Sequence, residues 1–225
     1  MIPLKDDNPT KNTSYLRILI IVICSIIFLV QISLDNDYLI SYFGFKPASL
    51  FTSTFYYETF NPILTIFTSM FMHAGWLHFL GNMLYLWIFS DNIEDALGRK
   101  KFIVFYLLSG VSAAIFQSLI DLDSNIPMIG ASGAIAGVLG AYMYIYPKAK
   151  ILILVPLLIF FFTIRLPALI VLGFWFVIQF LNMTLIYDNN SNVAWMAHIG
   201  GFVFGLIYSI FFVKKKKKGN SIFLK

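Results

Sequence analysis

Six runs of apolar residues, each close to the length of a membrane-spanning helix, dominate the sequence. A helix that crosses the bilayer needs roughly 20 mostly apolar residues, and the six runs lie at 16–33, 77–90, 102–120, 132–147, 166–185 and 194–213. Charged residues make up 12% of the 225-residue chain and hydrophobic residues 59%, whereas a soluble domain carries about 25% charged residues. We therefore predict an all-α, polytopic membrane protein with six transmembrane helices.

A further apolar segment, 150–165, does not suit a seventh span. Pro156 interrupts it, and Arg165 ends it after too few residues to cross the bilayer. An additional span would also break the alternation of charge between the loops. We expect this segment to be interfacial or re-entrant.

Positively charged residues gather in alternate loops. They cluster at 91–101, 147–165 and 214–218, whereas the loops at 121–127 and 188–192 contain none. Loops on the cytoplasmic side of a membrane carry the excess of Lys and Arg. This pattern predicts that both termini are cytoplasmic and that the second, fourth and sixth helices begin at the external face.

The chain divides into a short cytoplasmic tail (1–15), a six-helix membrane domain (16–213) and a basic cytoplasmic tail (214–225). The lysine run in the second tail follows a span directly, so the net charge of +5 indicates a membrane flank rather than a nucleic-acid partner. The single cysteine, Cys24, is expected to be a small buried residue in the first run. Four tryptophans lie near predicted helix ends, as in an interfacial aromatic belt: Trp76, Trp87, Trp175 and Trp195.

Polar side chains recur near the external ends of three predicted helices: His78, Asn82, Ser132 and His198, with His73 just ahead of the first. Polar groups at membrane depth are costly, so each is a functional candidate. At 1.5 Å per residue, those within the helices lie roughly 3–9 Å below the external ends. A lone serine or histidine is more often a packing residue, but a common depth on three helices favours a site.

Small residues lie near Ser132 and His198 in the sequence: Gly130, Gly133, Gly137, Gly201 and Gly205. In lipid, small residues let helices approach closely. We therefore expect the fourth and sixth helices to pack together, with Ser132 and His198 at the external end of the seam. A serine becomes nucleophilic when a base within about 2.6–3.2 Å takes its proton. The acidic residues nearby belong to loops, which favours a Ser–His dyad over a triad.

His78 and Asn82 lie four residues apart and thus on one face of the second helix. Donors at this level would stabilise an oxyanion, and the N–H of Ser132, near a helix start, is a further donor. Three histidines also raise the question of a metal site. No carboxylate or thiolate is expected at their depth, so we predict neither a metal nor a cofactor.

Four segments together resemble the rhomboid family of intramembrane serine proteases: HAGWLHFLGNM at 73–83, DNIEDALGRKKF at 91–102, GASG at 130–133 and AHIGGFVFG at 197–205. The segments occur in the family's order and on the expected helices. The resemblance implies cofactor-free cleavage of other membrane proteins within or beside their transmembrane segments. It implies Ser132 as nucleophile, His198 as general base and then acid, and His78, Asn82 and the Ser132 amide as the oxyanion hole.

Two features depart from the family's pattern. Ala136 stands where some members have an aromatic residue that stacks on the histidine, so another group must orient His198. Leu64 and Thr65 lie about where some members carry a Trp–Arg pair in the first external loop. The fifth helix with its loop at 188–192 resembles the family's substrate gate.

Two other functions are alternatives: a rhomboid-like protein that binds membrane partners without cutting them, and a small transporter. The presence of all four polar residues argues against a protein that only binds partners. These residues lie near one face of the membrane and the sequence shows no inverted repeat, which argues against a transporter. The expected partners are the lipid bilayer and transmembrane protein substrates. A bare six-helix core without an organelle presequence favours the bacterial plasma membrane.

Overall fold

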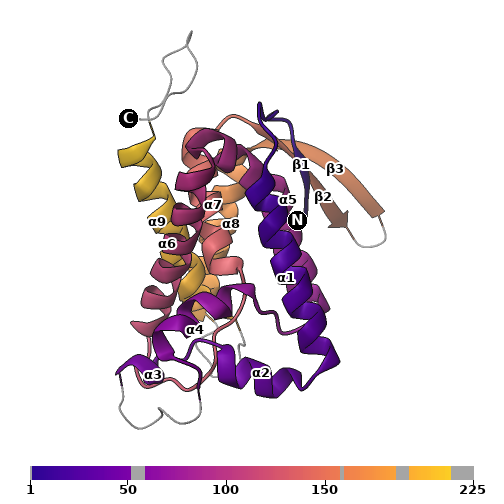
Figure 1. Ribbon diagram of the computed structural model, residues 1–225. Helices are drawn as coiled ribbons and strands as arrows, with labels where there is room; N and C mark the ends of the chain where they lie inside the picture. Colours follow the sequence, from indigo (N-terminus) through magenta and orange to yellow (C-terminus); the bar gives the residue numbers. More distant parts are fainter. Residues whose placement is uncertain (1, 52–58, 158–159, 186–192, 214–225) are drawn as a thin grey trace.

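A computed structural model describes residues 2–51, 59–157, 160–185 and 193–213 of the chain (Figure 1). The predicted gate loop at 188–192 and the basic tail at 214–225 lie outside these residues.

All six predicted runs form helices, and their ends lie close to the expected ones except for the end of the second run. The helices are α1 (Tyr15–Ser33), α5 (Trp76–Leu97), α6 (Arg99–Ser118), α7 (Ser132–Ile145), α8 (Ala168–Leu185) and α9 (Trp195–Phe212). Among the described helices, α1, α6, α8 and α9 are long and apolar enough to cross a membrane. The helical segment Pro62–Phe71 and α5 qualify as a fifth span when taken together, although they are bent by 82°. The protein is therefore a multi-pass, mostly helical membrane protein.

The connection between α1 and α5 contains short helices that gather at one end of the bundle (Figure 1). These are α2 (Asn36–Phe43), α3 (Ala48–Phe51), α4 (Pro62–Thr68) and the 3₁₀ turn η2 (Ser69–Phe71). Asn61 starts α4, because its side-chain oxygen accepts hydrogen bonds from the N–H groups of Ile63 and Leu64. The first turn of α1 and the last turn of α9 lie at the opposite end of the bundle (Figure 1).

The 14-residue helix α7 lies in the centre of the bundle, in contact with α5, α6, α8 and α9. Each residue from Gly133 to Tyr142 is buried. A Cβ atom on Gly201 or Gly205 of α9 would collide with backbone carbonyls of α7, at Gly133 and Gly137 respectively. In the structure, these two helices therefore pack closely through glycine.

The expectation of an all-α protein is wrong in one region. Within the described residues, β1 (Ile2–Asp6), β2 (Lys150–Leu157) and β3 (Phe160–Pro167) form an antiparallel sheet in the order β1-β2-β3. Segment 150–165 is thus a hairpin, because its β-branched and aromatic residues suit a pleated strand. Pro156 lies beyond the last residue that pairs with β1, Leu154, where a strand tolerates proline.

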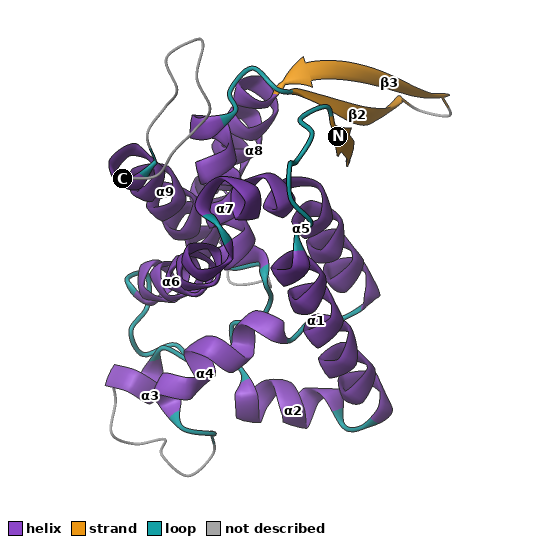
Figure 2. Cartoon of the chain, turned by 45° about the horizontal axis from the view of Figure 1, so that its top comes forward, coloured by secondary structure: helices purple, strands orange, loops and turns teal. Residues whose placement is uncertain are grey.

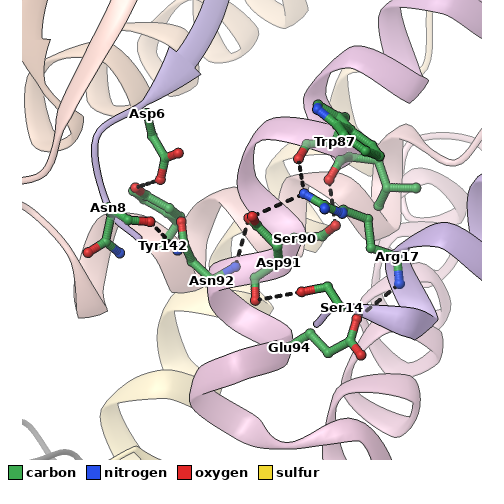
Figure 3. A network of polar contacts seen from close by, with 11 residues as sticks. Asp6, Asn8, Ser14, Arg17, Trp87, Ser90, Asp91, Asn92, Glu94 and Tyr142 are labelled. Carbon is green, nitrogen blue, oxygen red and sulfur yellow. Dashed lines mark hydrogen bonds and ion pairs between the residues drawn. The ribbon is translucent and has the colours of Figure 1, made fainter. Parts of the chain in front are cut away.

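The sheet and the N-terminal segment are tied to the bundle by polar contacts at the end that carries the termini (Figure 3). The hydroxyl of Tyr142 in α7 donates a hydrogen bond of 2.5 Å to the Asp6 carboxylate. The Glu94 carboxylate accepts from the N–H groups of Leu16 and Arg17, at 3.1 and 3.0 Å, and so caps the first turn of α1. Helix α5 therefore extends past its predicted end at residue 90, because residues 91–97 have partners in the N-terminal segment.

Candidate active site

The structure brings Ser132 and His198 into direct contact. Ser132 is the first residue of α7, His198 lies in the first turn of α9, and the distance from Oγ to Nε2 is 2.8 Å. This distance falls within the range of about 2.6–3.2 Å in which an imidazole can take a proton from a hydroxyl. Both residues are half-buried. The glycine seam between α7 and α9 sets their separation, because it brings the two helix beginnings together.

Gln179 of α8 holds the other face of the imidazole, a contact that sequence reasoning missed. The His198 Nδ1 atom lies 2.8 Å from the Oε1 atom of Gln179. The amide nitrogen of Gln179 donates to the carbonyl of Trp175 at 3.4 Å, which identifies Oε1 as the atom that faces His198. An amide oxygen only accepts. Nδ1 therefore carries the proton, and Nε2 is left as an acceptor for the Ser132 hydroxyl.

The rings of two tryptophans also surround His198. Trp175 lies at 5.8 Å between ring centroids with a tilt of 39°, and Trp195 at 6.1 Å with 84°. Trp175 was expected near a helix end, but it lies in the middle of α8 and belongs to the site. These rings and Gln179 take the place of the aromatic residue that Ala136 does not supply.

His78 lies near the serine, next to Gly130. A Cβ atom on Gly130 would be 2.6 Å from His78 Nε2 and 3.6 Å from Ser132 Oγ. The His78 Nδ1 atom accepts a hydrogen bond of 3.4 Å from the N–H of Ala74. In the neutral ring the proton is then on Nε2, so a donor faces the space next to Gly130 and Ser132.

Gly130 was expected to pack between helices, but in the structure it lies outside them, in a turn. It lies in the turn before α7 with a backbone φ of 120°, a conformation that residues with a side chain rarely adopt. Its N–H donates a hydrogen bond of 2.8 Å to the carbonyl of Ser69. A side chain here would also meet the ring of His78. Glycine therefore keeps the approach to the serine open.

Asn82 is buried on the same helix, one turn below His78. Its side-chain nitrogen donates to the carbonyl of His78 at 2.8 Å. In this structure, the Asn82 amide is bonded to its own helix, and its predicted part as an oxyanion donor stays a prediction. Ser132, as the first helical residue, has an N–H without an intrahelical partner.

His73 and Gln31 support this arrangement from behind. His73 is fully buried, and its ring contacts that of His78 at 5.2 Å. Gln31 of α1 binds the backbone of His73 twice: it accepts from the N–H at 3.0 Å and donates to the carbonyl at 3.2 Å. Sequence reasoning missed Gln31, although a buried glutamine within an apolar span was a visible signal.

The fold and the site together define a class: a multi-pass helical membrane protein in which a serine hydroxyl contacts a histidine nitrogen inside the bundle. The rhomboid domain family matches residues 61–215 of the chain. The protein belongs to the rhomboid family, which confirms the resemblance seen in its motifs.

Several named relatives share this domain. The chain is 30% identical over 164 residues to Rhomboid protein 1, mitochondrial, of Saccharomyces cerevisiae, an alignment that covers 69% of this chain and 43% of the relative. It is 31% identical over 174 residues to presenilin-associated rhomboid-like protein A, mitochondrial, of Danio rerio, covering 76% and 40%. A third relative, YdcA of Bacillus subtilis, is provisionally named a rhomboid protease and is 28% identical over 153 residues, covering 68% and 69%.

The chain spans less than half the length of the two mitochondrial relatives. Their mitochondrial names give no support to the expectation of a bacterial plasma membrane. What the comparisons and the apolar helices show together is a multi-pass membrane protein of the rhomboid family.

Proposed function

We propose that the protein is an intramembrane serine endopeptidase, which cleaves transmembrane segments of other membrane proteins with Ser132 and His198 as a catalytic dyad. The observation that carries this proposal is the 2.8 Å contact between Ser132 Oγ and His198 Nε2, with the tautomer set by Gln179. A protein that only binds partners has no use for a hydroxyl aimed at an imidazole acceptor.

In the first half of the reaction, Ser132 Oγ attacks the carbonyl carbon of the scissile peptide while its proton passes to His198 Nε2. The resulting imidazolium gives this proton to the departing amine nitrogen, which leaves an ester on Ser132. Water then attacks the ester, and His198 accepts its proton and returns it to Oγ. The partner of Nδ1 is an amide rather than a carboxylate, which supports a dyad.

The oxyanion of the tetrahedral intermediate would form next to Gly130, where donors converge. His78 Nε2 and the N–H of Ser132 supply two of them. Asn82 would supply a third after its amide turns away from the His78 carbonyl. Each such donor contributes about 3–4 kcal/mol to transition-state stability.

We further propose that α7 is a sixth span, with both termini in the cytoplasm. With 14 residues it is about 21 Å long, shorter than the hydrocarbon thickness of about 30 Å. A short central helix surrounded by longer ones begins below the membrane surface, which would place Ser132 beneath the external face, where water and an unwound substrate segment can meet.

Cleavage of a single-span reporter protein in proteoliposomes tests this function. We expect Ser132→Ala and His198→Ala each to reduce the cleavage rate by about 10³-fold or more. The matched control is Ser25→Ala, because Ser25 lies on α1 and bonds only to its own helix at Ile21. Full cleavage by either site variant would refute the dyad.

A further inference from the structure

The β2–β3 hairpin has one face that is entirely apolar. Directly paired residues of antiparallel strands lie on the same side of the sheet. One side therefore holds the pairs Ile151–Leu166, Ile153–Ile164, Val155–Phe162 and Leu157–Phe160. We call these eight residues the apolar face.

The two ends of the apolar face differ in what covers them. Ile151 and Ile153 are fully buried and belong to the core of the bundle. Further from the helices, Leu157 is 58% exposed, Phe160 69% and Phe162 43%. Figure 2 shows the hairpin projecting away from the helices. One continuous face thus rests on the bundle at its base and overhangs it toward its tip.

The opposite side of the hairpin carries its polar residues near its base, where Leu152 and Leu154 lie among them. Lys150, Thr163 and Arg165 lie on this side and are exposed, and Lys5 of β1 pairs onto it at Leu152. At the tip, Phe161 replaces the polar residues and is 68% exposed. The hairpin is therefore amphipathic at its base and apolar on both sides at its tip.

The place of the hairpin in the fold puts its base at a membrane surface. Pro167 ends β3, and the spanning helix α8 begins at the next residue, Ala168. Leu169 and Ile170 at the start of α8 are each 54% exposed, so lipid-facing surface continues directly from the hairpin's base. In Figure 1 the hairpin extends outward from this end of the bundle, to the right of the helices.

We propose that the apolar face of the hairpin lies on the lipid leaflet at the end of the bundle that carries the termini, as an interfacial anchor. Leu157, Phe160 and Phe162 insert between lipid chains, while Lys150 and Arg165, on the opposite side, face the headgroups and water. Transfer of these exposed apolar side chains from water into lipid is favourable.

The free backbone edge of β3 limits the depth of insertion. Open sheet edges are not tolerated in hydrocarbon, because their N–H and C=O groups would lack partners. The strands therefore stay at headgroup level and only side chains reach the acyl region, as in amphipathic elements that lie about 5–10 Å deep. A water-exposed patch of this kind on a soluble protein would instead be a site of association.

Fluorescent labels at two positions of β3 test the anchor in the full-length protein, reconstituted in phosphatidylcholine–phosphatidylglycerol vesicles. In a Cys24→Ala background, a polarity-sensitive dye is attached to Phe160→Cys or, as matched control, to Thr163→Cys on the opposite side. We expect lipid-borne quenchers to act severalfold more strongly on the dye at 160, and aqueous iodide to act severalfold more strongly on the dye at 163.

Equal iodide quenching of the two dyes would overturn the proposal. A second result would also overturn it: the dye at 160 is protected from iodide, lipid-borne quenchers do not reach it, and the protection disappears when the ratio of protein to lipid is lowered. In that case a second copy of the protein, and not lipid, would cover the apolar face. The same measurement in the Ser132→Ala variant gives the same result if the anchor exists, so this outcome is independent of proteolysis.

Discussion

The contact between Gln179 and His198 decides which imidazole nitrogen can serve as a base. Gln179 is 5% exposed, and its oxygen lies 2.8 Å from Nδ1. It does not touch Ser132 in the structure and acts through the ring, so its proposed role is positioning. Trp175 has a related role, because its carbonyl orients the glutamine amide.

Replacing Gln179 should change the pH dependence of cleavage as well as its rate. Gln179→Leu removes the acceptor for Nδ1–H, and we expect kcat to fall by about 10–10²-fold with little change in KM. Gln179→Glu places a negative charge beside Nδ1, which favours the imidazolium. The acidic limb of the rate profile should then move to higher pH, because the base must be neutral to act.

Rate–pH profiles of the purified variants in detergent measure this effect. A purely structural role for Gln179 would lower the amount of folded protein in both variants without moving the profile. An unchanged profile in Gln179→Glu would therefore contradict the positioning role.

Asn82 should contribute to turnover only in part. Its amide is bonded to the His78 carbonyl, and His78 and the Ser132 N–H remain as donors when it is removed. We expect Asn82→Ala to lower kcat by about 10²–10³-fold without abolishing cleavage. Unchanged kinetics would remove Asn82 from the oxyanion hole.

At the scale of the elements, the seam between α7 and α9 positions the proposed dyad. Gly205 has no space for a Cβ atom because the carbonyl of Gly137 lies against it. Gly205→Ala must push the helices apart, and overpacking of this kind costs about 1–3 kcal/mol. We expect a lower Tm and a loss of cleavage greater than the loss of folded protein, since the Ser132–His198 distance increases.

Gly173 of α8 provides the matched control. It also lies within a helix, but nothing lies within 4 Å of a Cβ placed on it. Gly173→Ala should keep the wild-type Tm or raise it, because alanine favours a helix by up to about 1 kcal/mol over glycine. Equal Tm changes in both variants would contradict the seam's role.

At the scale of the whole molecule, Asp6 joins the sheet to the helix bundle. Burial raises the pKa of Asp6 above its usual value of 3.8, although the hydrogen bond from Tyr142 opposes this. The folded protein therefore holds a proton on Asp6 at pH values just above 3.8, where the unfolded chain has lost it. Stability from this group falls as pH rises through this window.

Asp6→Asn should remove this pH dependence, because the amide still offers an oxygen to Tyr142 but carries no charge. We expect its unfolding free energy at neutral pH to equal or exceed that of the wild type. Tyr142→Phe should be less stable at neutral pH, since it leaves the buried carboxylate without its donor. Chemical unfolding at several pH values measures both variants, and an unchanged pH slope in Asp6→Asn would contradict this account.

Much of the site could be predicted because helix direction and depth follow from sequence. Ser132 and His198 each stand at the beginning of a helix that starts at the same end of the bundle, so their common level was visible. Gln179 was missed for a related reason. Helix α8 runs the opposite way, so a residue at the same level lies six positions before its end at Leu185, about 9 Å along the helix.

The helices and their order follow from the amino-acid sequence alone, because apolar runs must satisfy their backbone hydrogen bonds within themselves in lipid. The rhomboid motifs and the glycine seam follow from it as well. Three features became visible only in the folded chain: the partner of His198 Nδ1, the role of Gly130 in the turn beside His78, and the pairing of segment 150–165 with the N-terminal strand. These features depend on contacts between residues far apart in the chain, and the apolar composition of a strand and that of a buried helix are alike.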